Sequence, residues 1–174
     1  MKKILALTSV LAVAAGLLVP LSAHAGVLGN SVNESYNFPT LGAIYENDGT
    51  QSVSPTAQWT AFGQVTSTMS GTQLFITFDV TSAFNAAAFN GTVYTDFTNN
   101  WGPVTVDAAT NFAAFNAGDV TVSGDLLEVN MANLGAFSPS NQIVLDFTAV
   151  PEPASIALLG AGLFGLRLVR RKRA

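Results

Sequence analysis

The sequence contains no cysteine, and its one histidine, His24, lies near the N-terminus. Every lysine and arginine lies in the first three or the last eight residues, so residues 26–149 contain ten acids and no cation, a formal charge of −10. Without cations this segment cannot clamp phosphate groups, which excludes nucleic acid as a partner. Without histidine or cysteine it lacks the usual zinc and copper ligands, the usual base for a catalytic nucleophile, and a thiol for a lipid anchor.

The N-terminus has the parts of a secretory signal peptide. A positively charged start precedes an apolar stretch over residues 4–19. Ala23 and Ala25 form an A-x-A cleavage site, which predicts Gly26 as the first mature residue. We therefore assign residues 1–25 to a cleaved signal peptide, with a retained N-terminal anchor as the alternative.

The last twenty-five residues, 150–174, combine a rigid hinge, an apolar segment and a basic end. The hinge is Pro151, Glu152 and Pro153, in which each proline fixes φ and extends the residue before it. Residues 154–169 would form a helix of about 24 Å, against about 30 Å of hydrocarbon in a bilayer. The basic end contains Arg170, Arg171, Lys172 and Arg173. Because cations beside an apolar span mark its cytoplasmic side, these flanks favour a transmembrane helix despite its marginal length.

This three-part C-terminus resembles the sorting signal of the bacterial PEP-CTERM family. The resemblance implies export, transient anchoring in the inner membrane by the C-terminal helix, and recognition by an exosortase, a membrane-embedded processing enzyme. Pro151, Glu152 and Pro153 then correspond to the recognition motif, and residues 170–173 to the stop signal. Cleavage would release the protein to the cell surface or to an extracellular polysaccharide matrix, as in a biofilm.

Between the two ends, the pattern predicts short β-strands separated by turn residues. The clearest strand is 73–81, where Leu74, Ile76 and Phe78 alternate with polar residues. The other predicted strands are 36–38, 43–46, 58–69, 92–97, 104–106, 120–122, 127–131 and 143–147. The last two alternate in the same way, so the inward-facing residues predicted there are Leu127, Val129, Met131, Ile143, Leu145 and Phe147. Turns are predicted at residues 47–49 and at Asn90-Gly91. Residues 83–90 are predicted as a helical turn or a loop, and residues 108–118 are ambiguous.

About nine short strands without a long helix predict an all-β domain over residues 26–149, an antiparallel β-sandwich or jelly roll. A closed barrel of the same strands is the alternative. Residues 89–96, 127–130 and 143–147 also resemble the cargo of other PEP-CTERM proteins. That resemblance implies a β-sandwich surface domain with no assigned activity.

Calcium is the one cofactor that the composition suggests. A domain with a charge of −10 repels itself, and a hard cation bound by loop carboxylates would relieve the repulsion. Asp48, Asp96 and Asp107 lie at or near predicted turns and are the candidate ligands. No EF-hand or Asp/Gly repeat accompanies them, so the expectation is no cofactor, with calcium as the alternative.

Aromatic side chains are the candidate ligand contacts, since exposed rings can stack on sugars. Trp101, in the loop Asn-Asn-Trp-Gly-Pro, and Tyr94 are the proposed contact residues, with Trp59 and Tyr45 as further candidates. Such residues also serve as core or loop anchors, and we favour the core for Trp59. For Trp101 the two interpretations stay open.

No constellation of residues predicts catalysis. Glu34, Glu46 and Glu128, with seven aspartates, could supply paired carboxylates for glycoside hydrolysis, but acids that alternate along a strand are ordinarily its solvated face. The sequence therefore predicts a non-enzymatic exported surface or matrix protein that contacts polysaccharide. A carbohydrate-active enzyme and a calcium-dependent adhesin are the alternatives.

Overall fold

The computed structural model describes residues 26–147, and the predictions for residues 1–25 and 148–174 lie outside that range. The described part consists of antiparallel strands with one short 3-10 helix, η1 (Ala117–Asp119). The prediction of an all-β antiparallel fold is therefore confirmed. Within residues 26–147, no helix has the length and apolar character that crossing a membrane requires.

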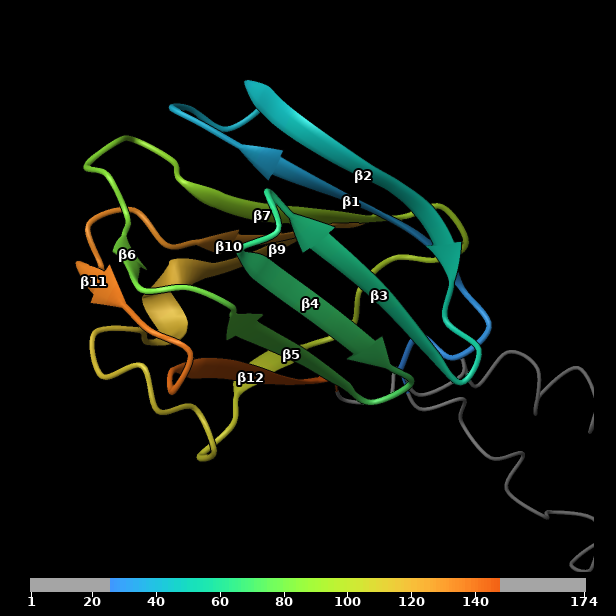
Figure 1. Ribbon diagram of the computed structural model, residues 1–174. Helices are drawn as coiled ribbons and strands as arrows, with labels where there is room; N and C mark the ends of the chain where they lie inside the picture. The colour runs from blue at the N-terminus through green and yellow to red at the C-terminus, as the bar shows by residue number, and fades with distance from the viewer. Residues whose placement is uncertain (1–25, 148–174) are drawn as a thin grey trace, which may run out of the picture.

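Two five-stranded sheets lie face to face (Figure 1). The first has the strand order β2-β1-β7-β10-β9 and the second the order β3-β4-β5-β12-β8. The strands of the first sheet are β1 (Ser31–Asn37), β2 (Ile44–Ser52), β7 (Gly91–Asp96), β9 (Val120–Ser123) and β10 (Leu126–Asn130). Those of the second are β3 (Thr56–Ala61), β4 (Val65–Ser70), β5 (Gln73–Phe78), β8 (Val104–Val106) and β12 (Gln142–Phe147).

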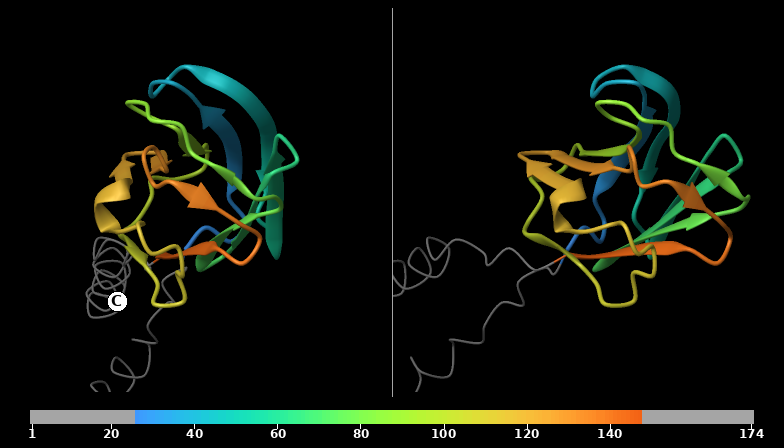
Figure 2. Two further views of the ribbon diagram at one scale, coloured as in Figure 1. Left: turned by 60° about the vertical axis from the view of Figure 1, so that its left-hand side comes forward. Right: turned by 90° about the vertical axis from the view of Figure 1, so that its left-hand side faces the viewer.

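A small third sheet pairs β6 (Ser82–Ala83) with β11 (Ala136–Phe137). It lies at one end of the domain, on the side that faces the viewer in the right panel of Figure 2. Ala83 belongs to β6, and residues 84–90 form a loop, one of the two outcomes predicted for residues 83–90. Residues 108–116 contain no helix or strand, residues 117 and 118 belong to η1, and Phe112 and Phe115 are buried.

Alternating side chains from both sheets fill one hydrophobic core. Leu74, Ile76 and Phe78 of β5 are at most 2% exposed, and so are Leu127 and Val129 of β10. The inward faces predicted for these strands are therefore confirmed. Each such side chain contributes about 1.5–3 kcal/mol on burial, so this core supports a domain without disulfides.

The turn predicted at residues 47–49 is wrong, because β2 continues through these residues. Asp48 is an extra residue in the pairing of β2 with β1, a β-bulge. Gly49 has a φ of +85°, and its N–H donates to Asn47 Oδ1 at 2.9 Å. The turn chemistry of Asn-Asp-Gly thus bends a continuous strand and does not end it.

Residues 58–69 form two strands, β3 and β4, where a single strand was predicted. Phe62 and Gly63 between them have φ values of +54° and +61°, and the N–H of Gln64 donates to the carbonyl of Ala61 at 2.9 Å. Two consecutive left-handed residues make a tight hairpin turn. A phenylalanine in that conformation is uncommon, which is why the pattern of residue types did not predict the turn.

Both ends of the described chain meet at the turn between β4 and β5. The N–H of Val27 donates to the carbonyl of Gly71 at 2.9 Å, and the N–H of Phe147 donates to the carbonyl of Thr72 at 2.8 Å. The chain therefore enters and leaves the domain at one pole, on the right in Figure 1.

Candidate functional site

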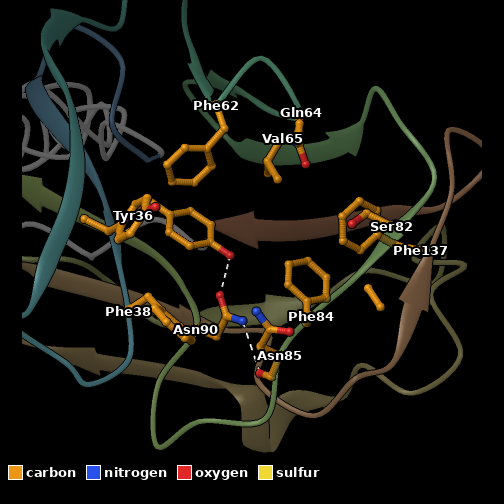
Figure 3. A pocket seen from close by; sticks show the side chains of 12 residues that line it. Tyr36, Phe38, Phe62, Gln64, Val65, Ser82, Phe84, Asn85, Asn90 and Phe137 are labelled. Carbon is orange, nitrogen blue, oxygen red and sulfur yellow. Dashed lines mark hydrogen bonds between the residues drawn. The ribbon is translucent and has the colours of Figure 1, made fainter.

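A cavity of about 390 Å³ lies at the opposite pole, and we call it the aromatic pocket (Figure 3). Six of its lining side chains are aromatic: Tyr36, Phe38, Tyr45, Phe62, Phe84 and Phe137. Strand β4 begins in the pocket with Val65 and ends with Ser70, beside the turn that receives both chain ends. The pocket and the chain ends are thus one six-residue strand apart, roughly 20 Å.

Four of the rings pack edge to face near the mouth of the pocket. The ring of Phe62 lies 4.9 Å from that of Tyr36, at 81°, and 5.3 Å from that of Tyr45, at 66°. The rings of Phe38 and Tyr45 are 6.4 Å apart. Tyr45 is 68% exposed and Phe62 is 38% exposed, whereas Tyr36 is buried, so the two outer rings present bare apolar surface.

The other wall of the pocket is buried and firmly supported. The rings of Phe84 and Phe137 lie 4.6 Å apart, and Phe78 contacts both from the core, at 5.8 and 4.8 Å. Each of these three rings is at most 7% exposed. Because close-packed rings cannot rotate freely, this wall is a fixed surface.

Uncharged polar groups occupy the floor and rim. The hydroxyl of Tyr36 donates to Asn90 Oδ1 at 2.5 Å, and Asn90 Nδ2 donates to the carbonyl of Asn85 at 3.2 Å (Figure 3). Burial raises the pKa of Tyr36 above its usual value, so this hydroxyl stays protonated. The side chains of Gln64, Ser82 and Asn85 have no hydrogen bond within residues 26–147, which leaves their donors and acceptors available.

Phe62 is held over the mouth in a strained backbone conformation. A left-handed φ costs a non-glycine residue about 1–3 kcal/mol. The N–H of Phe62 donates to Glu46 Oε2 at 2.8 Å, and its ring contacts Tyr36 and Tyr45, which together hold the strained residue in place. The tight turn between β3 and β4 requires this φ, so the position of the ring over the mouth is fixed by the hairpin.

The two residues proposed from the sequence as ligand contacts, Tyr94 and Trp101, lie elsewhere. Tyr94 has no exposed surface, and Trp101 is 7% exposed, with its Nε1 donating to the carbonyl of Asp125 at 2.8 Å. The expectation that Tyr94 is exposed is wrong, because the inward face of β7 carries its ring into the core. For Trp101, of the two interpretations left open, the structure supports the anchor, because its indole packs on Phe147. Neither residue lines the aromatic pocket. The prediction that Trp59 is a core residue is confirmed.

Tyr45 is the one ring from that group that reaches the aromatic pocket. The other five aromatic lining residues were not predicted. They come from the end of β1, the turn between β3 and β4, and the segments of β6 and β11, so no local spacing links them. A phenylalanine directly before the glycine of a hairpin, at Phe62-Gly63, is the one signal that the sequence offered.

The candidate calcium ligands do not come together. Asp96 is buried and accepts from Asn30 Nδ2 at 2.5 Å and from the N–H of Thr98 at 2.8 Å. Asp107 accepts from the N–H of Ala109 at 2.6 Å. Within the described part of the chain, no three acidic or histidine side chains lie close enough to hold one ion.

A buried polar cluster joins the two sheets near Asp48. Ser67 Oγ of β4 donates to Glu34 Oε1 of β1 at 2.8 Å and lies 2.6 Å from the hydroxyl of Tyr94 on β7. Glu34 has no exposed surface, and its Oε2 has no hydrogen-bond partner within residues 26–147. Burial, together with the nearby Asp48 and Glu46, raises the pKa of Glu34 from 4.5 to about 7.

The residues assigned to targeting lie largely outside the described range. These are Ala23 and Ala25 of the cleavage site, Pro151, Glu152 and Pro153 of the sorting motif, and Arg170, Arg171, Lys172 and Arg173 of the stop signal. Gly26, the predicted first mature residue, is described: it has a φ of +77°, and an added Cβ would lie 1.4 Å from the carbonyl oxygen of Gly71. Glycine is therefore required at this position.

Comparison with known proteins gives one match. The chain matches no curated protein and no solved structure. A family model, the PEP-CTERM protein-sorting motif, matches residues 149–173, which span the hinge, the apolar segment and the basic end. This motif implies export, transient membrane anchoring at the C-terminus and exosortase-dependent sorting to the cell surface. The chain is therefore a PEP-CTERM domain-containing protein.

Proposed function

We propose that this protein is a non-enzymatic binding module, which an exosortase delivers to the cell surface and which associates there with the polysaccharide of the extracellular matrix, as in a biofilm. The observation that carries the proposal is the sorting motif at residues 149–173. In the proposed organisation, a cleaved signal peptide (1–25) precedes a surface domain (26–149) and the sorting signal (150–174). The two facing sheets support a β-sandwich of the jelly-roll kind for that domain.

The lining of the aromatic pocket supports binding without catalysis. It contains rings, amides and hydroxyls, but no carboxylate or imidazole that could act as a general acid or base. Glu34 has a pKa shifted into the range of a catalytic acid, yet it has no exposed surface through which a substrate could reach it. We expect no release of reducing sugar from isolated matrix polysaccharide, in contrast to the result expected for a glycoside hydrolase.

Replacing Pro151, Glu152 and Pro153 together by alanine is expected to stop processing. Because the hinge would no longer be recognised, the uncut protein should accumulate in the membrane fraction. The measurement is fractionation of cells into cytosol, membrane and medium, with the mass of the C-terminus determined for each form.

The matched control is a triple alanine variant of Ser138, Ser140 and Asn141, a surface cluster on the loop before β12. It should be sorted as the wild-type protein is. Equal distribution of the wild-type and hinge variants among the fractions would refute exosortase-dependent sorting.

Calcium is not part of the proposed mechanism. We expect the melting temperature of the protein to be the same in EDTA and in millimolar calcium chloride, because the carboxylates of Asp48, Asp96 and Asp107 are separate. A clear rise in the melting temperature with calcium, which binding to the folded state alone would cause, would favour the calcium-dependent adhesin instead.

A further inference from the structure

We propose that the aromatic pocket is a binding site for a neutral sugar of a polysaccharide chain. The inference deepens the proposed function and rests on it, because it names the ligand class and the residues that would meet the matrix. The ligand expected is an uncharged pyranose, stacked on the rings of Tyr45 and Phe62 and hydrogen-bonded by the amides and the hydroxyl along the rim.

The bare rings at the mouth give the first argument. Tyr45 and Phe62 leave large apolar surfaces in water, while the rings behind them are buried and fixed. One C–H face of a pyranose is apolar and would cover such a ring. Phe62 is fixed at the mouth by the hairpin turn between β3 and β4, by the bond from its N–H to Glu46 Oε2 at 2.8 Å, and by ring contacts with Tyr36 and Tyr45.

The polar groups give the second argument. Gln64, Ser82 and Asn85 offer two amides and one hydroxyl, each able to donate and to accept, without competing bonds inside residues 26–147. The hydroxyl groups around a sugar ring can likewise both donate and accept hydrogen bonds. A lipid chain would leave these amides unpaired in an apolar contact, which is unfavourable.

The charge of the domain and the volume of the cavity restrict the class of sugar that the pocket can bind. Residues 26–147 contain no lysine or arginine, and the domain has a charge of −10, so uronate or sulfate sugars would be repelled with no cation to hold them. The cavity of about 390 Å³ is near the lower end of the range for small-molecule sites, about 300–1,000 Å³. The cavity is therefore large enough for a short part of a polysaccharide, such as its terminal sugar.

The test is affinity electrophoresis and calorimetry of the full chain with polysaccharide isolated from the cells that make it. Anion exchange separates that material into neutral and acidic fractions, and neutral hexose oligomers serve as defined probes. The proposal expects binding to the neutral fraction and to at least one neutral oligomer. Binding to the acidic fraction alone, or to no fraction at millimolar concentration, would overturn it.

Two variants locate the site. Tyr45→Ala removes an exposed ring, and Phe62→Asn replaces the strained phenylalanine with a residue that tolerates a left-handed φ. Each is expected to weaken binding at least about tenfold, the effect of losing one good ring contact, with the melting temperature nearly unchanged. Phe97→Ala, which removes a ring 64% exposed and outside the pocket, should bind normally.

Unchanged binding by folded Tyr45→Ala and Phe62→Asn would place the sugar elsewhere and refute the assignment of the pocket. Tyr45→Phe, which keeps the ring, should bind as the wild type does. The same variants should be sorted to the surface normally. Loss of sugar binding with normal sorting therefore concerns the pocket alone, whereas failure of sorting in the wild-type protein concerns the proposed function.

Discussion

We expect the free energy of unfolding to fall by roughly 3 kcal/mol as the pH rises from about 4.5 to above 7, because of the single carboxyl group of Glu34. Burial between the sheets raises the pKa of this group from 4.5 to about 7, with smaller contributions from Asp48 and Glu46 in the same direction. A difference of one in pKa corresponds to about 1.4 kcal/mol. The native state therefore favours the protonated carboxyl by roughly 3 kcal/mol.

The direction of this pH dependence follows from the number of protons that the native and unfolded states bind. Between the unfolded pKa of 4.5 and the folded pKa of about 7, the native state binds a proton that the unfolded state has released. The stabilisation is fully present below pH 4.5 and is lost as the pH rises through 7. Burial and the charge of Glu46 also raise the pKa of Asp48, which adds to the trend.

Glu34→Gln, measured by urea unfolding across this pH range, tests the assignment. Since glutamine stays neutral, the variant should lose most of the pH dependence and be more stable than the wild-type protein at pH 8. Glu128→Gln is the matched control, because it removes one charge from a partly exposed position on β10 of the same sheet. A Glu34→Gln protein that keeps the wild-type pH dependence would show that Glu34 is not its source.

Gly91→Ala is expected to lower the free energy of unfolding by about 3 kcal/mol or more. An added Cβ would lie 2.0 Å from the carbonyl oxygen of Val129 and 3.1 Å from the nitrogen of Met131, both in the backbone of the neighbouring chain segment. Neither atom can move without separating β7 from β10. Asn90, in the floor of the aromatic pocket, would shift with them, because its carbonyl accepts from the N–H of Met131 at 2.8 Å.

The measurement is the urea midpoint, which should fall by about 1–3 M for a loss of this size. Gly124→Ala is the control. Gly124 has a φ of +62° and nothing within 4 Å of an added Cβ, so its replacement adds backbone strain without a clash. It should cost about 1 kcal/mol, close to the general cost of a left-handed alanine. Equal costs for the two variants would contradict a steric role for Gly91.

Gly91 shows why local residue patterns led to wrong turn predictions. Asn-Gly predicted a turn, but Gly91 pairs with Asn37 and Asn130 inside the first sheet. Glycine is needed there for close approach of two chains, and no local pattern distinguishes that need from a turn. The turn predicted at residues 47–49 was wrong for the same reason, because Asn-Asp-Gly forms a β-bulge there and does not end the strand.

The hydrophobic alternation was more reliable, because it depends on only one physical demand, that every second side chain of a half-buried strand faces the core. It predicted the inward faces of β5, β10 and β12 correctly. The aromatic pocket could not be predicted, because its rings come from five segments that only the tertiary fold brings together. The contact residues proposed from the sequence, Tyr94 and Trp101, are instead buried in the core.

The meeting of both chain ends at the turn between β4 and β5 gives the domain a direction. Any attachment through Phe147 would hold the molecule at that pole, and the mouth formed by Tyr45 and Phe62 lies about one strand length away from it. A domain displayed in this way keeps its mouth clear of the surface that carries it, and neighbouring copies could stand side by side without blocking one another.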